Sequence, residues 1–142
     1  MGDKFDCLKI SNQLCFPLYA AAKEIVKRYT PVLEELDLTY TQYITLLVIW
    51  EYDGLSVKDL GAKLFLDSGT LSPVLKSLEQ KKYVVRKRDE DDERCVKVYL
   101  TDAGIALKDK ALSVPEKIAA CVRLSPEEAT ALYGILYKIL GR

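Results

Sequence analysis

LSVKDLGAKLFLDSGTLSPVLKSLEQKKYVVRKRDEDDERCVKVYLTDAG (residues 55–104) predicts a helix, a tight turn, a second helix and two short strands joined by a highly charged hairpin. Ser56 can cap the first helix, and Asp67 or Ser68 can cap the second. Apolar positions recur on one face of each helix: Val57, Leu60 and Leu64 in the first, and Leu71, Val74, Leu75 and Leu78 in the second. The segments YVVRKR and CVKVYL are β-rich, and the charged run between them is too polar to be buried. The stretch therefore predicts a winged helix-turn-helix.

The outer surface of the second helix carries short hydroxyls and a cation. These side chains follow the cap at Asp67 and suit a helix whose N-terminal end approaches phosphates and base edges: Ser68, Thr70, Ser72 and Lys76. A basic cluster comes directly after this helix: Lys81, Lys82, Arg86, Lys87 and Arg88. The formal net charge of the chain is zero, but DNA responds to a local basic face, so neutrality does not exclude DNA binding.

Composition narrows the class of protein. The chain has 142 residues, enough for one domain with its own core. No apolar run approaches the roughly 18 residues of a membrane span, and no signal peptide opens the chain, so we expect no membrane partner. Four cysteines without a CxxC pair, in a chain without histidine, argue against a zinc site, and we expect no metal and no other cofactor. The number and spacing of the cysteines fit free thiols in a cytoplasmic protein.

The segment before the winged unit predicts two helices. The first ten residues are expected to form a partly ordered arm. A helix is predicted over residues 11–29, with Pro17 in its first turn or at a bend, and Pro31 is expected to end it. Thr39 and Gln42 form a capping-box pattern for an apolar helix that reaches about Tyr52.

The segment after the winged unit predicts two more helices. Thr101 can cap a helix that is broken or kinked near Pro115. Ser125 can cap a last helix with Pro126 at its first position, and one face of that helix is apolar: Ala129, Leu132, Tyr133, Leu136 and Leu140. The terminal helices are more apolar than one compact unit needs, which favours a homodimer over helices that wrap only their own domain.

These elements predict a mainly α fold with a small β-hairpin wing (α+β), organised as a single domain over residues 1–142. Residues 39–104 form the expected DNA-binding lobe, and residues 8–30 and 105–142 the expected dimerisation helices. Two identical recognition helices in such a dimer fall about 34 Å apart, on successive turns of an inverted-repeat operator in double-stranded DNA.

Two sets of motifs carry a family resemblance. LDSGTLSPVLKSLE together with VVRKRDEDDERCVKVYLTDAG resembles the MarR family of winged-helix regulators, whose most specific mark is the D-x-R element, here Asp92 and Arg94, followed by V-x-V-x-LT. NQLCFPLYAAAKE together with LDLTYTQYITLLVIWE resembles the OhrR group, the organic hydroperoxide-sensing repressors. The similarity covers residues 8–104 and fades toward the C-terminus.

The resemblance implies a redox site. It matches Cys15 to the peroxidatic cysteine, Tyr29 and Tyr40 to tyrosines whose hydroxyls bond the sulfur across the dimer, and Tyr19 to a third tyrosine nearby. A helix N-terminus and phenol donors favour the thiolate, which is the nucleophile toward a peroxide oxygen. The sulfenic acid so formed can condense with another thiol, either Cys121 of the partner chain or a low-molecular-weight thiol.

The resemblance also implies DNA contacts in the wing. The D-x-R element is expected to reach DNA, with Asp92 orienting Arg94 through an ion pair that serves a minor-groove contact, and the basic cluster adds Arg86 and Arg88 as expected DNA contacts. The chain departs from the group at Ser77, where relatives often carry arginine, and at Pro17. We expect the first change to alter operator affinity or preference and the second to alter the reactivity of Cys15.

The predicted function is that of a dimeric repressor, not an enzyme, which releases its operator when an organic hydroperoxide oxidises Cys15. Judged singly, Cys15 can be a small core hydrophobe, and Tyr29 and Tyr40 can be ordinary half-buried aromatics. Three alternatives remain open: a MarR-type regulator that responds to a small aromatic ligand, a thiol peroxidase, and a winged helix that binds protein.

Overall fold

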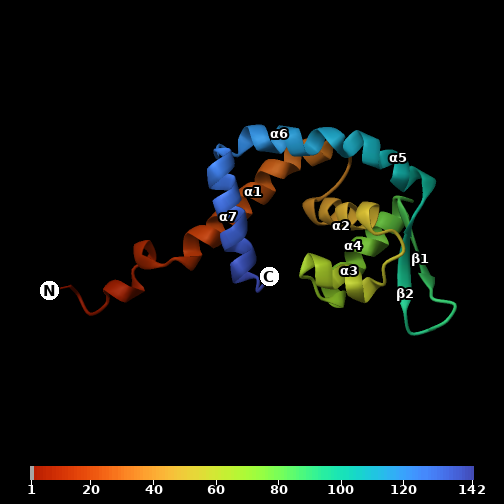
Figure 1. The fold of residues 1–142 in the computed structure, drawn as a ribbon, viewed down its shortest axis with the longest axis horizontal. Helices are drawn as coiled ribbons and strands as arrows, with labels where there is room; N and C mark the ends of the chain where they lie inside the picture. Colours follow the sequence, from red (N-terminus) through yellow and green to blue (C-terminus); the bar gives the residue numbers. More distant parts are fainter. Residues whose placement is uncertain (1) are drawn as a thin grey trace.

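The computed structural model describes residues 2–142 and contains the predicted elements in the predicted order (Figure 1). The helices and strands are α1 (Cys15–Glu34), α2 (Tyr40–Glu51), α3 (Val57–Leu64), α4 (Ser68–Gln80), β1 (Val84–Arg88), β2 (Val96–Leu100), α5 (Asp102–Lys110), α6 (Val114–Cys121) and α7 (Pro126–Ile139). Short 3₁₀ turns lie at Asp6–Leu8, Ile10–Asn12 and Ala111–Ser113. Figure 1 shows α2, α3, α4 and the β hairpin as one lobe, with α5 and α6 across it and the N-terminal arm extending away.

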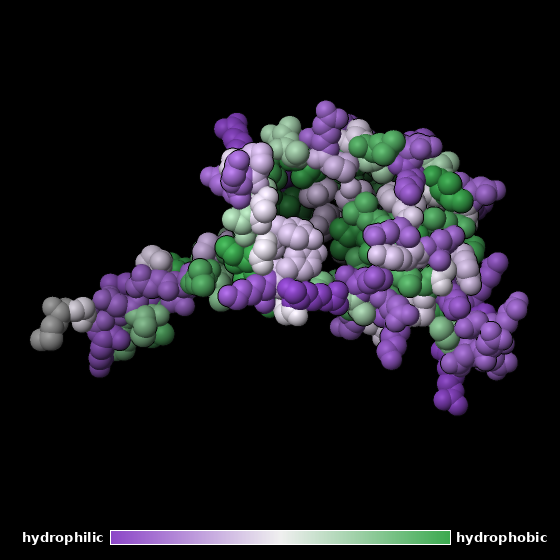
Figure 2. All heavy atoms as spheres, in the orientation of Figure 1, coloured by the Kyte–Doolittle hydropathy of each residue, from purple (hydrophilic) through white to green (hydrophobic). Residues whose placement is uncertain are grey.

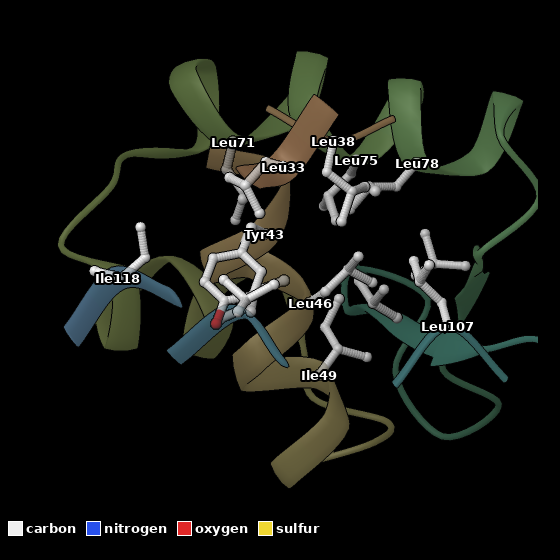
Figure 3. Close-up of a cluster of buried hydrophobic side chains, with 14 residues drawn as sticks. Leu33, Leu38, Tyr43, Leu46, Ile49, Leu71, Leu75, Leu78, Leu107 and Ile118 are labelled. Atoms are coloured by element: carbon white, nitrogen blue, oxygen red, sulfur yellow. The ribbon is translucent and has the colours of Figure 1, made fainter. Parts of the chain in front are cut away.

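The hydrophobic core joins this lobe to the C-terminal end of α1 and to α5 and α6 (Figure 3). Helix α2 lies at its centre, where Leu46 and Ile49 have no exposed surface. The inward positions predicted for α4 are confirmed, since Leu71, Leu75 and Leu78 are fully buried and Val74 is half-buried against the same core. Burying each such leucine contributes on the order of 2 kcal/mol, so the core fixes how the helix-turn-helix sits.

Local caps define the helix-turn-helix as the sequence predicts. Ser56 Oγ accepts the N–H of Asp59 at 3.0 Å, and Asp67 Oδ1 accepts the N–H of Thr70 at 2.7 Å. The turn between α3 and α4 is tight: an added Cβ at Gly61 would stand 2.7 Å from the carbonyl oxygen of Leu66. The position therefore requires glycine, and the close approach sets the angle at which α4 leaves the turn.

The wing is an antiparallel hairpin in which Val84 pairs with Leu100 and Arg88 with Val96. Its second strand is tied to the loop that precedes α3, because Val98 N donates to the Leu55 carbonyl and Gly54 N donates to the Val98 carbonyl, each at 2.9 Å. These two hydrogen bonds attach the hairpin to the helix-turn-helix.

Helix α1 differs from the prediction at both ends. It begins at Cys15, not at residue 11, and it continues through Pro31 to Glu34. The expectation that Pro31 ends the helix was wrong, because Pro31 and Lys27 are both exposed and the Lys27 carbonyl, which loses its helical partner, can bond to water. Pro17 lies in the first turn, as one of the two expected arrangements required, where no N–H donor is needed. The break between α5 and α6 falls at Ala111–Ser113, next to Pro115 as predicted.

Much apolar surface in the arm, α1 and α7 is uncovered in a single chain. Leu8 is 74 % exposed, Leu14 87 % and Tyr133 65 %, and α7 has no buried residue. Figure 2 shows hydrophobic residues at the surface where the arm meets the body. Among the residues that the model describes, no helix is long and apolar enough to cross a membrane.

Candidate functional site

Cys15 is the first residue of α1, and its side chain is exposed. Within residues 2–142 its sulfur has no hydrogen-bond partner and forms no disulfide. Cys15 thus lies in the first turn of a helix, where backbone N–H groups lack helical partners and negative charge is stabilised. Tyr19 follows one helical turn later, 61 % exposed, with the Lys23 ammonium 5.3 Å from the centre of its ring.

A tyrosine cluster lies near the other end of α1. The ring of Tyr29 stands 4.8 Å from the ring of Tyr40 and 5.8 Å from the ring of Tyr43, measured between centroids. Burial raises the pKa of Tyr29 above its ordinary value, and the neighbouring phenols Tyr40 and Tyr43 raise it further. Burial likewise raises the pKa of Tyr40. These phenols are therefore neutral near pH 7 and act as hydrogen-bond donors.

One chain does not bring Cys15 and the tyrosine cluster together. Cys15 and Tyr29 lie on the same continuous helix, and the 14 residue steps between them correspond to about 21 Å of helix axis. Tyr19 is thus near Cys15 in the same chain, whereas Tyr29 and Tyr40 are remote from it. A thiol site that contains Cys15, Tyr29 and Tyr40 requires two chains.

Cys121, the last residue of α6, lies close to the tyrosine end of α1. The carbonyl oxygen of Cys121 accepts a hydrogen bond from Arg28 Nη1 at 2.7 Å, and Arg28 also pairs with Glu24 at 3.3 Å. A disulfide between Cys15 and Cys121 of the same chain is therefore excluded in this fold by the length of α1. Of the other thiols, Cys7 lies exposed in the arm and Cys95 is half-buried at the loop end of the wing, directly before β2.

A surface groove joins the N-terminal end of α4, the start of α3 and the wing, including the loop of its hairpin. The groove brings together most of the residues that the sequence assigned to DNA: Asp67, Ser68, Ser72, Arg86, Asp92 and Arg94. Thr70 and Lys76 lie exposed on α4 outside the lining of this groove, and Arg88 is exposed at the end of β1.

The contacts of the wing arginines differ from one another. Arg86 is held by Glu79 of α4 through two bonds, Nε–Oε1 at 2.6 Å and Nη2–Oε2 at 3.3 Å. Arg88 Nη1 donates to the Glu93 carbonyl at 3.0 Å across the hairpin. The Arg94 guanidinium has no partner among the described residues. Arg94 is thus free to meet an external anion, while Arg86 has an internal partner.

One expectation for this surface needs correction. The ion pair between the side chains of Asp92 and Arg94 is not formed; Asp92 Oδ1 instead accepts the backbone N–H of Arg94 at 3.0 Å, because the turn directs the carboxylate to the main chain. The effect of Ser77 on operator affinity stays a prediction, but the structure shows what this side chain contacts. Its hydroxyl accepts a hydrogen bond from Gln42 Nε2 at 2.7 Å and so faces α2.

Sequence reasoning did not single out Tyr43 or Arg28. The spacing of Tyr40 and Tyr43, three residues apart on one helix, was a signal for a shared face. Nothing in the local sequence pointed to the contact between Arg28 and Cys121, which are 93 residues apart.

Comparisons with known proteins agree with this architecture. The family model described as "Transcriptional regulator SarA/Rot" matches residues 27–111. The "Organic hydroperoxide resistance transcriptional regulator" of Bacillus subtilis is 47 % identical over 99 % of this chain and 95 % of its own length. The "HTH-type transcriptional regulator SarZ" of Staphylococcus aureus is 44 % identical over 94 % of this chain and 90 % of its own length.

Among solved structures, overoxidized AbfR bound to DNA is 33 % identical, with a TM-score of 0.78 and 98 % of each chain covered. AbfR is a protein of Staphylococcus epidermidis, and further structures represent its reduced form bound to DNA and its disulfide form. These relatives are transcriptional regulators and not enzymes, in agreement with the sequence prediction. The chain belongs to the MarR-type family of winged-helix transcriptional regulators, in the group of organic hydroperoxide resistance regulators.

Proposed function

We propose that a homodimer of this chain is a cytoplasmic repressor that binds an inverted-repeat operator and releases it when an organic hydroperoxide oxidises Cys15. The observation that carries the proposal is the position of Cys15 and Tyr29 at opposite ends of one helix. In one chain the exposed thiol lies far from the phenol donors, so the site is incomplete. In a dimer the thiol of one chain can meet the phenols of the other.

The middle of α1 suits such a pairing. If two copies of α1 cross antiparallel about a two-fold axis near Ala22, Cys15 of each copy lies level with Tyr29 of the other. Residues Ala20, Ala21 and Ala22 are all exposed, and small side chains allow two helices to approach closely at this point. The exposed Phe16 and Val26 on α1 would be covered by the same contact.

The chemistry follows from the site. The Cys15 thiolate attacks one oxygen of the hydroperoxide, the O–O bond breaks, and the alkoxide leaves and takes a proton to become an alcohol. The sulfenic acid then condenses with a second thiol, with loss of water and formation of an S–S bond. Arg28 fixes Cys121 beside the tyrosine end of α1, so a second copy that delivers Cys15 to Tyr29 also brings it toward Cys121. A low-molecular-weight thiol is the other candidate for this step.

Oxidation would act on DNA through the dimer. We assign residues 39–104 to the DNA-binding lobe and residues 8–30 and 105–142 to the dimerisation helices. In the reduced dimer the two α4 helices enter major grooves about 34 Å apart, and the free Arg94 of each wing reaches the minor groove. A new covalent bond and lost phenol hydrogen bonds at the seam would shift the two lobes and change this spacing.

The test uses a fluorescein-labelled duplex that this protein selects from random-sequence DNA. Fluorescence anisotropy is recorded before and after one equivalent of cumene hydroperoxide, for the wild type and for Cys15→Ser. We expect both reduced proteins to bind and only the wild type to be released, with dithiothreitol restoring binding. Equal release of Cys15→Ser, or no release of either protein, would contradict the proposal. Continued consumption of peroxide with dithiothreitol would instead indicate a thiol peroxidase.

A further inference from the structure

Tyr43 is the member of the tyrosine cluster with the most restricted surroundings. It lies on α2 one turn after Tyr40 and is only 3 % exposed, whereas Tyr29 and Tyr40 are half-buried. Figure 3 shows its ring inside the buried side-chain cluster, whose members include Leu33 and Ile118. The Tyr43 ring therefore has a fixed place, set by packing from α1, α2 and α6.

Tyr29 is packed between two rings of α2. Its plane is tilted 54° to the plane of Tyr40 and 39° to that of Tyr43. A half-exposed tyrosine on a helix can adopt more than one χ1 rotamer, and a contact with an immobile neighbour selects one of them. Since Tyr40 is itself only half-buried, Tyr43 is the neighbour that can hold Tyr29 in place.

We propose that Tyr43 is a positioning residue of the peroxide-sensing site, whose buried ring holds Tyr29 in the orientation that directs its hydroxyl to Cys15 of a second copy. The proposal rests on the function proposed above. Tyr43 acts through Tyr29 and through its ring. Phenylalanine at position 43 keeps the ring contact, and leucine removes it.

The orientation of the Tyr29 hydroxyl should have a measurable effect on the reactivity of the Cys15 thiolate. A hydrogen bond from a phenol stabilises a thiolate, so loss of one such donor makes the thiolate less available and slows its reaction with a peroxide or an alkylating reagent. Because the hydroxyl must be held within about 0.5 Å of its productive place, rotation of Tyr29 into another rotamer has the same consequence as its removal.

The test compares Tyr43→Leu and Tyr43→Phe with the wild type. The pH profile of iodoacetamide alkylation is followed at the Cys15 peptide by mass spectrometry, and the rate of Cys15 oxidation by cumene hydroperoxide is measured at pH 7. We expect Tyr43→Leu to move the alkylation midpoint upward and to slow oxidation about tenfold. Tyr43→Phe should stay within about twofold of the wild type.

Leu46→Ala is the matched control, because Leu46 is a fully buried residue of the same helix and has no aromatic ring that could hold Tyr29. It should lower stability and leave the alkylation profile unchanged, which separates positioning from a general loss of packing. A wild-type profile for Tyr43→Leu, or an equal shift for Tyr43→Phe, would overturn the proposal. If Tyr29→Phe slows oxidation while Tyr43→Leu does not, only this inference fails. If peroxide releases Cys15→Ser from DNA, the proposed function itself fails.

Discussion

Arg28 and Cys121 join α1 to the end of α6 through a single hydrogen bond, in which the guanidinium Nη1 lies 2.7 Å from the carbonyl oxygen of Cys121. This carbonyl belongs to the last turn of α6, where carbonyl groups lack helical partners and a cation is favourable. The bond ties the backbone of Cys121 to the residue that precedes Tyr29 in α1. The chain thereby gathers its phenols and its second thiol at one end of α1 and keeps Cys15 at the other.

Arg28→Ala should slow formation of the disulfide between Cys15 and Cys121 of two chains by about tenfold, because the end of α6 is no longer fixed beside the phenols. Non-reducing gel electrophoresis after one equivalent of cumene hydroperoxide measures this rate. Lys117→Ala is the control, since it removes another contact between α6 and the end of α1, the 2.8 Å ion pair with Glu35. Equal rates in both variants and the wild type would show that Arg28 does not place Cys121.

Lys76 and Ser77 are neighbours on α4 with opposite surroundings. Lys76 is exposed, whereas Ser77 accepts a hydrogen bond from the buried amide of Gln42. Lys76→Ala should weaken DNA binding and reduce the salt slope by about two for a dimer, with little effect on stability. Ser77→Ala should lower the free energy of unfolding by about 1 to 3 kcal/mol, because the Gln42 amide loses its acceptor, and leave DNA affinity unchanged.

Anisotropy titrations at several salt concentrations measure the DNA affinity and its salt slope, and urea unfolding measures the free energy of unfolding. Both measurements are made on both variants, so each variant is the control for the other. A loss of DNA affinity in Ser77→Ala would support the expectation that position 77 affects operator binding. A loss of stability in Lys76→Ala would show that this lysine has an internal contact.

Local signals explain why most of the fold was predictable. The caps at Thr39, Ser56, Asp67, Thr101 and Ser125 are each made within three or four residues, and all five are present. The error at Pro31 came from treating an exposed proline as a helix end. The termination signal lies at Asp37, which adopts a left-handed conformation with φ 54°.

The site was less predictable, because its relationships are between elements. The contact of Tyr29 with Tyr43 and the bond from Arg28 to Cys121 depend on how α1 packs against α2 and α6, which no local pattern specifies. The roles of Cys15 and Tyr29 entered only through the family resemblance. Their separation along one helix is the structural fact that requires a second chain.

Arg94 and Arg86 should respond differently to substitution. Arg94→Ala should weaken DNA binding and reduce the salt slope by about two for a dimer, because its guanidinium is free to meet phosphate or the minor groove. Arg86→Ala should mainly lower the free energy of unfolding, by about 0.5 to 1 kcal/mol, since its guanidinium is half-buried against Glu79. Anisotropy titrations measure the DNA affinity and its salt slope, and urea unfolding measures the free energy of unfolding. Lys110→Ala, an exposed lysine on α5, is the control for a simple loss of charge. Equal salt slopes for Arg94→Ala and Lys110→Ala would contradict the assignment of Arg94 to DNA.

Asp67 makes the stability of α4 depend on pH. The hydrogen bond from the Thr70 N–H lowers the pKa of Asp67 below its ordinary value, so the folded protein favours the charged carboxylate. The stabilisation is complete above the unfolded pKa of about 3.9 and is lost as pH falls through the lower folded pKa.

Asp67→Asn keeps an oxygen acceptor but cannot ionise. The wild type should therefore have a higher Tm than Asp67→Asn at pH 7, and the two Tm values should converge as the pH is lowered below the folded pKa, when measured by circular dichroism. Asp67→Ala, which lacks the acceptor, should stay below both at every pH. A constant difference between wild type and Asp67→Asn down to the lowest pH would show that the carboxylate charge does not contribute to the cap.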